Sequence, residues 1–181
     1  MKTNYTIRPA TIADAEFIAL AVCMAVGYDR SHPIYPVFEQ LARMEHSQYS
    51  YRNTLVAEID GHVVGALVGY DGARLYELRE PIFPLIAEHL GTPVTIEDET
   101  EPGEFYLDSL GVLAEYRGMG IGGALIEAML NKAFADGHKR AGLIVDFDNP
   151  DAERLYLSLG FRRVGTKRFL GHDMYHLQVW R

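Results

Sequence analysis

Apolar and polar residues alternate along the chain with two different periods, and each change of period marks the boundary of an expected element. Helical spacing predicts helices over about 12–25 and over 120–136. Two apolar, strand-like runs cover 54–59 and 62–68. They are joined by Asp60-Gly61, a pair whose backbone freedom favours a tight two-residue turn. These runs are therefore predicted to form a hairpin.

Prolines and glycines limit most of the other expected elements. Pro81 and Pro84 should divide a helical stretch over 73–90. The remaining predictions are an edge strand from Tyr5 that stops at Pro9, a helix over 36–48, strands over 105–113 and 141–145, a helix after Asn149-Pro150, and strands over 161–167 and 174–180. Strands that alternate with helices and also form hairpins predict one α/β domain, residues 1–181, with a mixed sheet.

The stretch from Leu107 to Gly123 joins the expected central strand to a glycine-dense turn and a helix. Four of the six residues from Gly118 to Gly123 are glycine, and Arg117 precedes them. Glycine has no Cβ, so consecutive backbone N–H groups can converge there, and the helix start adds unpaired donors. With Arg117, these groups predict a site for a multiply charged anion such as a phosphate or pyrophosphate.

Composition narrows the class of protein. The 181 residues are 48% apolar, which is enough for one core, and the net charge of −8 argues against nonspecific nucleic-acid binding. No long apolar span and no N-terminal signal pattern are present, so we expect a cytoplasmic protein that does not enter a membrane. Cys23 is the only cysteine, which excludes an intrachain disulfide. The histidines are scattered, and no metal site is predicted.

The glycine turn also fits the dinucleotide-binding spacing G-x-G-x-x-G, and Asp146 ends the next strand, where a ribose-binding acid would lie. That fingerprint places its first glycine directly after the strand, whereas residues 114–117 intervene here. Asp146 also lies farther along the chain than the about 20 positions expected. Ala124 stands where a P-loop requires lysine. An NAD(P)-binding oxidoreductase is therefore the weaker hypothesis.

A second interpretation uses several motifs together. Arg117-Gly-Met-Gly-Ile-Gly122 matches R-x-x-G-x-G, and it is followed by Asn149 and by Leu155-Tyr156-x-x-x-Gly160-Phe161. With Arg8-Pro-Ala-Thr11 at the start, this combination resembles the GNAT superfamily of acetyl-CoA-dependent N-acetyltransferases over most of the chain. The resemblance implies a GNAT-like fold: a mixed, mostly antiparallel sheet with a splayed parallel central strand pair, flanked by helices. An insertion at about 73–103 before the central strand departs from the pattern, as does Ala114 in place of a common proline.

The resemblance also implies a cofactor site for acetyl-CoA, with coenzyme A as product. The pyrophosphate would lie on the backbone amides of the glycine turn, and the pantetheine arm would pair with the strand before it, where Gly111 is expected to mark a bulge. Asn149 is a further candidate pantetheine contact and also a candidate helix cap, and the two roles do not exclude each other. The implied cofactor residues are Leu110, Gly111, Val112, Arg117, Gly118, Met119, Gly120, Ile121, Gly122, Gly123 and Asn149.

Acetyl transfer to an amine needs a neutral nucleophile, a donor for the oxyanion and a proton for the leaving thiolate. Tyr156 matches the family position for the thiol-protonating acid, and the N–H of Val112 is a candidate oxyanion donor. Strand alternation places Glu104, Tyr106, Asp108 and Leu110 on one face, provided that no bulge intervenes. Asp108 is the first candidate for the base and Glu104 the second, with a water relay as a third possibility. Each residue also has a purely structural interpretation.

The expected activity is N-acetyl transfer to a primary amine of a small molecule or peptide, by direct attack in a ternary complex. A non-catalytic acyl-CoA sensor is the alternative from another class, although Tyr156 favours the enzyme. Tyr28, His32, Tyr35 and Tyr106 are candidate substrate contacts. The acidic residues between Gly91 and Glu104 form either a solvated linker or an attractive field for an amine. The C-terminal strands are also compatible with a homodimer.

Overall fold

The computed structural model describes residues 4–181; residues 1–3, which the single-domain prediction includes, lie outside the described part. The strands are β1 (Thr6–Pro9), β2 (Thr54–Ile59), β3 (His62–Asp71), β4 (Phe105–Val112), β5 (Arg140–Asp146), β6 (Arg162–Phe169) and β7 (His172–Trp180). The helices are α1 (Ala15–Ala25), α2 (Tyr35–Arg43), α3 (Leu75–Arg79), α4 (Ile82–Leu90), α5 (Ile121–Ala135) and α6 (Pro150–Ser158). Every strand and helix expected from the sequence is present, with shifted ends.

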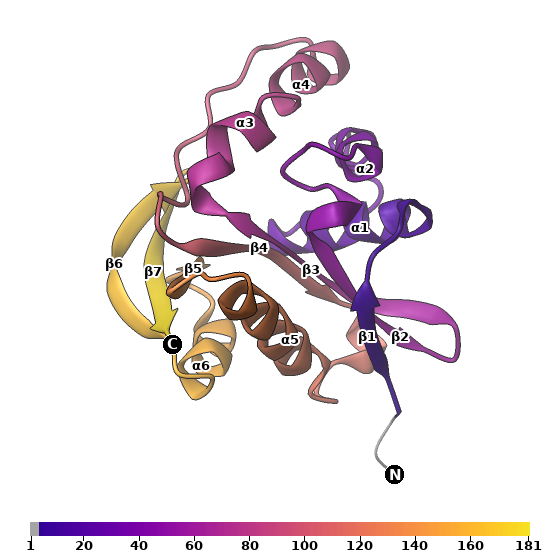
Figure 1. Ribbon diagram of the computed structural model, residues 1–181. Coiled ribbons are helices and arrows are strands. Elements are labelled where there is room, and N and C mark those ends of the chain that lie inside the picture. The colour runs from indigo at the N-terminus through magenta and orange to yellow at the C-terminus, as the bar shows by residue number, and fades with distance from the viewer. Residues whose placement is uncertain (1–3) are drawn as a thin grey trace.

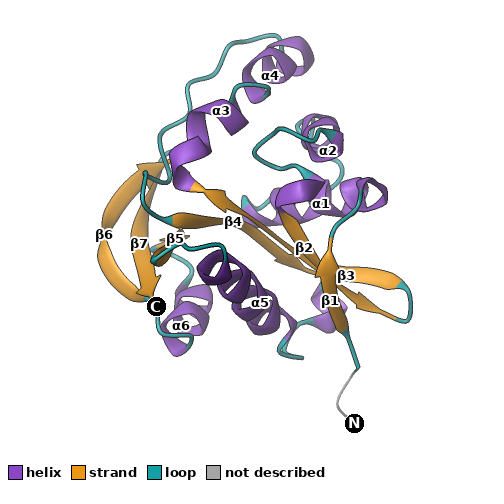
Figure 2. Cartoon of the chain, in the orientation of Figure 1, coloured by secondary structure: helices purple, strands orange, loops and turns teal. Residues whose placement is uncertain are grey.

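The seven strands form one sheet in the order β1-β2-β3-β4-β5-β7-β6, and helices cover both of its faces (Figure 1). Helices α1 to α4 lie over one face, and α5 and α6 lie over the other (Figure 2). Each face has its own apolar core, because alternate strand side chains point to opposite sides of a sheet. Except for the parallel pair β4–β5, all neighbouring strands are antiparallel, as the mixed-sheet prediction requires.

The parallel strands β4 and β5 are in register only near their beginnings. Phe105 pairs with Ala141 and Tyr106 with Gly142, and no pairing follows although both strands continue. The two strands therefore diverge toward their carboxyl ends, which confirms the predicted splay. From Leu107 onward, the edge of β4 that faces β5 has no strand partner.

A register shift lies within β4, but not at the position predicted from the sequence. Gly69 of β3 pairs with Leu107 and Val68 pairs with Ser109, so Asp108 is the extra residue. Gly111, the predicted bulge, pairs regularly with Ala66, and that prediction is wrong. An extra residue changes which side chains share a face. Tyr106 and Asp108 stay together, whereas Leu110 packs into the core on the α5 face.

Gly111 has a different physical role from the one expected. A Cβ at this position would lie 2.7 Å from Ala21 Cα and 2.8 Å from Ala21 Cβ, both in α1. Real Cβ atoms do not approach other atoms so closely, so glycine is what lets α1 pack directly on the sheet. By contrast, the hairpin turn forms as predicted: Asp60 and Gly61 have φ angles of 49° and 79°.

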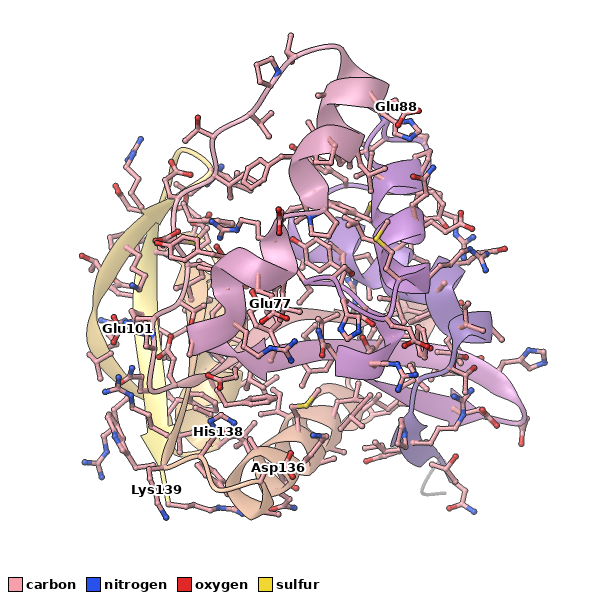
Figure 3. The ribbon with its side chains drawn as sticks, turned by 45° about the horizontal axis from the view of Figure 1, so that its top comes forward. Glu77, Glu88, Glu101, Asp136, His138 and Lys139 are labelled. Atoms are coloured by element: carbon pink, nitrogen blue, oxygen red, sulfur yellow. The ribbon has the colours of Figure 1, made fainter. Side chains whose placement is uncertain are left out.

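Residues 73–103 form an excursion between β3 and β4 that returns along the β6–β7 hairpin. Helices α3 and α4 are separated at Glu80-Pro81, as the prolines predict, and α4 lies beside α2 (Figure 1). The returning segment is tied to the hairpin, because the Leu170 N–H donates to Glu97 and Lys167 Nζ lies 3.8 Å from Glu101. Figure 3 shows Glu77 on α3 and Glu101 beside strands β6 and β7.

The second helix ends at Arg43 and not at the predicted residue 48. The Ser47 hydroxyl donates to the Leu41 carbonyl, and the Gln48 N–H donates to the Leu78 carbonyl in α3. These contacts turn the chain inward after α2, because they satisfy backbone groups that a continued helix would have used. Gln48 becomes 2% exposed as a result, which places its amide group in the interior.

We predict that Gly111→Ala destabilises the fold by about 1–3 kcal/mol, since the added methyl group must displace α1 from the sheet. Urea unfolding measures the change. Gly165→Ala is the matched control, because its Cβ would meet no atom within 4 Å. The control should change the free energy of unfolding by less than about 0.5 kcal/mol. Equal effects of the two substitutions would contradict the close-packing explanation.

Candidate active site

The glycine turn presents a row of backbone donors at the surface. Arg117 to Gly120 are exposed, Gly118 and Gly120 have φ angles of 76° and 81°, and α5 begins at Ile121. Among the described residues, the N–H groups of 118–123 donate no hydrogen bond to the protein. Both positive φ angles favour glycine, and the helix dipole adds positive potential. The turn therefore has the donors that a phosphate group requires, and the residues fit the predicted pyrophosphate site.

The free edge of β4 adds backbone groups directly before this turn. The Leu113 N–H donates to the Val64 carbonyl of β3 at 2.9 Å. Successive N–H groups of a strand point to opposite sides, so the Val112 and Leu110 N–H groups point toward the gap left by β5. The Arg117 guanidinium donates to the Val112 carbonyl at 3.1 Å, which fixes the end of the strand. An extended ligand arm can pair with this edge as an added strand would.

Asn149 and Tyr156 lie on the other side of the gap, at the start and in the middle of α6. The Asn149 side-chain oxygen caps the helix by accepting from the Ala152 N–H at 3.2 Å, so the structural interpretation of this residue is confirmed. Its amide NH2 group donates to no described residue. Tyr156 is half-buried, its ring packs edge-on against Phe161 at 6.0 Å, and its hydroxyl bonds to no described group. Burial raises the pKa of Tyr156 to about 12, so the phenol stays protonated at neutral pH.

Asp108 lies on the α1 face of the sheet, within a network of buried polar groups. Its Oδ2 atom accepts from Gln48 Nε2 and from the Tyr70 hydroxyl, both at 2.8 Å. Its Oδ1 atom accepts from the Ser109 hydroxyl at 2.7 Å. The bulge allows this arrangement, because it turns Asp108 toward β3 and α2 without moving Tyr106 from the same face. Burial raises the pKa of Asp108 above its ordinary value, which makes its carboxylate a stronger base.

A second carboxylate, Glu99, reaches the same network from the 73–103 excursion. Glu99 is 2% exposed, and its Oε1 atom accepts from Gln48 Nε2 at 2.6 Å. Arg79 of α3, also 2% exposed, forms an ion pair with Glu99 and a longer one with Asp98 at 3.2 Å. Burial, together with the charge of Asp108, raises the pKa of Glu99 to about 7. Two carboxyl groups with raised pKa values thus lie around one amide nitrogen.

Glu104, the second candidate base, occupies a separate and fully enclosed position. Its carboxylate accepts from Thr100 at 2.7 Å, from His176 Nε2 at 2.9 Å and from Gln178 at 2.6 Å. A Cβ on Gly142 would overlap the carboxylate, so glycine in β5 leaves the space for it. Burial raises the pKa of Glu104, but the three hydrogen bonds outweigh this effect and hold the pKa below its ordinary value. Such a carboxylate is a weak base.

The candidate substrate residues are not brought to Asp108 as a group. Tyr28 and His32 stack on each other at 3.8 Å, with Tyr28 44% exposed. The Tyr35 hydroxyl donates to the Glu16 carbonyl on α1 at 3.0 Å. Tyr106 is buried, and its ring lies edge-on against Tyr70 at 5.7 Å. No contact among the described residues joins Tyr28, His32 or Tyr35 to the network around Asp108.

An open hollow of about 270 Å³ lies where β5 ends, lined by Asp146, Phe147, Asp148, Gly171, His172 and Asp173. Asp146 Oδ2 lies 2.7 Å from His172 Nδ1 in the wall of this hollow. The carboxyl ends of the diverging strands point to this side of the molecule.

Sequence reasoning missed Gln48, Tyr70, Arg79 and Glu99. The helix predicted over 36–48 includes Gln48, and Tyr70 lies just beyond the strand predicted over 62–68. Arg79 carries a weak signal, as a cation amid the apolar positions of 75–86. The acidic run 97–99 marked the right segment but not which of its carboxylates turns inward. No local pattern could find that, because the contacts span between 20 and 60 residues of sequence.

Cys23 is fully buried in α1, and burial raises the pKa of its thiol to about 11. The chain's only cysteine is therefore neither exposed nor activated as a nucleophile. No helix of residues 4–181 is long and apolar enough to cross a membrane.

Comparison with known proteins gives a consistent result. Residues 20–161 match the sequence model of the acetyltransferase (GNAT) family. A solved acetyltransferase structure is 35% identical, with a TM-score of 0.81, over 97% of this chain and 98% of that one. An N-alpha-acetyltransferase of Sulfurisphaera tokodaii is 29% identical over 95% of this chain and 90% of its own length. The N-alpha-acetyltransferase RimI of Mycobacterium tuberculosis is 39% identical over 72 residues, which span 38% of this chain and 42% of RimI.

We predict that Glu104→Gln lowers the free energy of unfolding at pH 7 by about 1–3 kcal/mol, because three buried donors lose an ionised acceptor. A carboxyl group whose pKa is lowered by folding stabilises the fold above its unfolded value of 4.5, and this contribution is lost as the pH falls through the folded pKa. The difference from wild type should therefore shrink at pH values below 4.5. Urea unfolding between pH 7 and pH 3 measures it.

The control for this prediction is Glu101→Gln, in the same segment. Glu101 is partly exposed, and its ion pairs to Arg140 and Lys167 are long, at 3.5 and 3.8 Å. Its loss should cost less than about 1 kcal/mol. A difference for Glu104→Gln that stayed constant over the whole pH range would show that the carboxylate is not ionised in the folded protein.

Proposed function

The chain belongs to the acetyltransferase (GNAT) family, whose members are acetyl-CoA-dependent acyltransferases, and on this premise we propose that it transfers an acetyl group to the α-amine of a peptide. The observation that carries the proposal is the arrangement around the β4–β5 gap. A row of free backbone donors lies at one end, a half-buried carboxylate lies on β4, and a protonated phenol lies across the gap on α6.

In the proposed cofactor site, the amides of 118–123 hold the pyrophosphate beside Arg117, and the free β4 edge at Leu110 and Val112 pairs with the pantetheine arm. Asn149 can donate its free NH2 group to the same arm while its oxygen caps α6. Bound acetyl-CoA supplies an activated thioester whose carbonyl carbon is open to attack by an amine.

Three groups of the chain serve the reaction in this proposal. Asp108 accepts a proton from the attacking amine. The Val112 N–H, which points into the gap, donates to the oxygen on which negative charge develops. Tyr156 donates to the departing sulfur and recovers its proton from solvent. Glu104 is a less suitable base, because hydrogen bonds already saturate its carboxylate.

We propose that the amine attacks the thioester directly in a ternary complex. The chain's single cysteine, Cys23, is buried in α1, and burial raises the pKa of its thiol. This supports direct attack over transfer through an acetylated cysteine.

Two features favour an α-amine over other primary amines. The relatives named above include two N-alpha-acetyltransferases, one of which aligns over nearly the whole chain. A carboxylate base removes a proton more readily from an α-ammonium, with a pKa near about 8, than from a lysine or alkyl ammonium near about 10.4. A small amine remains the alternative acceptor, because the anionic hollow at the end of β5 can attract one.

We predict that a peptide with a free N-terminus reacts at pH 7 with a kcat/KM about a hundredfold higher than the same peptide with a blocked N-terminus and an internal lysine, in line with the pKa gap. Thiol release from acetyl-CoA measures the rate, and mass spectrometry locates the acetyl group. A polyamine and an alkyl amine complete the panel. Turnover with none of these amines would support the sensor hypothesis, and stabilisation by NAD(P) without any by acetyl-CoA would overturn the family-based proposal.

We predict that Tyr156→Phe lowers kcat by about a hundredfold with little change in acetyl-CoA affinity, since only the proton donor is lost. Stability should hardly change, because the Tyr156 hydroxyl bonds to no described group. Single-turnover kinetics and calorimetric titration with acetyl-CoA separate the two effects. Tyr51→Phe, which also removes a phenol but lies by Glu45, should retain the wild-type rate. An unaltered kcat in Tyr156→Phe would remove this residue from the mechanism.

A further inference from the structure

The two inward-facing carboxylates share the same hydrogen-bond donors. Gln48 Nε2 lies 2.6 Å from Glu99 Oε1 and 2.8 Å from Asp108 Oδ2. The Tyr70 hydroxyl lies 2.8 Å from the same Asp108 oxygen and 3.4 Å from the same Glu99 oxygen. Two carboxylate oxygens thus converge on one amide nitrogen and one phenol, and these two donors have only three hydrogens between them.

The orientation of the Gln48 side-chain amide is set by the two carboxylates. Its Oε1 atom is buried and has no hydrogen-bond partner among the described residues. The reverse orientation would turn that oxygen toward two carboxylate oxygens and is unfavourable. A buried acceptor without a partner costs free energy. The hydrogen bonds from Nε2 to the two carboxylates offset the cost of the unpaired Oε1 atom.

Glu99 is held in place by the 73–103 excursion itself. Arg79 of α3 pairs with Glu99 and also donates to the backbone carbonyls of Ile96 and Glu97, at 3.2 and 3.1 Å. These contacts fix the returning segment directly above β4. The excursion therefore delivers a charged group to the proposed base, which no part of the sheet alone provides.

The charges around Asp108 do not balance within the buried region. Arg79 is the cation of the cluster, and Glu99 and the more exposed Asp98 both pair with it.

Three tyrosines also face this region: Tyr70 comes from β3, Tyr106 from β4, and Tyr49 from the turn after α2. Burial and the two carboxylates raise the pKa values of all three phenols, which therefore stay neutral. Glu104, farther along the sheet, is satisfied by its own donors. Two carboxylates that share one cation, Glu99 buried and Asp108 half-buried, favour uptake of a proton.

We propose that Glu99 is a positioning residue for acetyl transfer: it and Asp108 act as one proton-sharing pair, bridged by Gln48 and Tyr70, and the pair accepts the proton of the attacking amine. The inference rests on the proposed function, in which Asp108 is the base. With both carboxyl groups ionised, the pair takes one proton from the amine nitrogen as the nitrogen–carbon bond forms. It then releases that proton to solvent, while Tyr156 supplies the proton for the sulfur.

We predict that Glu99→Gln moves the acidic limb of the kcat/KM profile to lower pH by about one pH unit or more, because Asp108 loses an anionic neighbour and Arg79 is freed to stabilise its ionised form. Tyr70→Phe should move the same limb to higher pH, since it removes a donor to the Asp108 carboxylate. A structural defect lowers activity in both variants but does not shift the limb in opposite directions. One peptide substrate serves all variants, so its own titration is common to them.

Asp98→Asn is the matched control. It removes the other carboxylate that pairs with Arg79 but does not face Asp108, so the acidic limb should stay within about 0.3 pH units of wild type. If Glu99→Gln fails to fold, carboxyl titration of the wild-type protein by carbon NMR still tests the pair, because it needs no variant. Limbs that move in the same direction, or that move equally in Asp98→Asn, would overturn the proposal.

A direct titration separates this inference from the proposed function. Carbon NMR of the side-chain carboxyl groups in the free enzyme should show Glu99 and Asp108 titrating together above the ordinary carboxyl range. In Glu99→Gln, Asp108 should titrate alone at lower pH. Independent, ordinary titrations in the wild-type protein would overturn the shared proton. By contrast, a coupled pair together with an unaltered rate in Asp108→Asn would overturn the proposed base and leave the pair in place.

Discussion

Strands β4 and β5 are held together at their first two paired positions and then separate, and the architecture of the site depends on this divergence. Each core lies on one face of the sheet, so opening the strands exposes backbone groups without exposing either core. The gap leaves the β4 edge free to pair with a ligand, and α6, with Tyr156, lies on the other side of the gap. The glycine turn follows β4 and presents unpaired backbone donors to the same ligand.

The bulge at Asp108 and the close contact at Gly111 have two different effects on β4: the bulge orients side chains, and the glycine allows close helix packing. The extra residue at Asp108 rotates the rest of β4, so that Asp108 faces the polar network while Leu110 faces α5. Gly111 lets α1 pack closely on the face of the sheet that carries this network. A half-buried carboxylate that is supplied with donors keeps a raised pKa and a fixed orientation, both of which suit a base.

The sequence predicted those features that short stretches determine. Asp60-Gly61 predicted the hairpin, the prolines at 81 and 84 predicted the divided helix, and 117–123 predicted the donor-rich turn, because each depends on local backbone geometry. The sequence did not predict where α2 ends, where the bulge lies, or that Glu99 turns inward. A bulge depends on the register of the partner strand. Glu99 turns inward because it binds Arg79 and Gln48, which lie 20 and 51 residues away in the sequence. The motif resemblance identified the family correctly, since each of its motifs is a short run of residues that can be recognised without the tertiary structure.

The two halves of the proposed site also differ in how the chain assembles them. The turn at 117–123 consists of consecutive residues and can form as soon as α5 does. The network around Asp108 joins residues 48, 70, 79, 99 and 108, so several long loops must close before it exists. Contacts of long sequence separation form late in folding because their entropic cost comes first. The glycine turn therefore needs only local structure, whereas the network that would activate the amine exists only once most of the domain has folded.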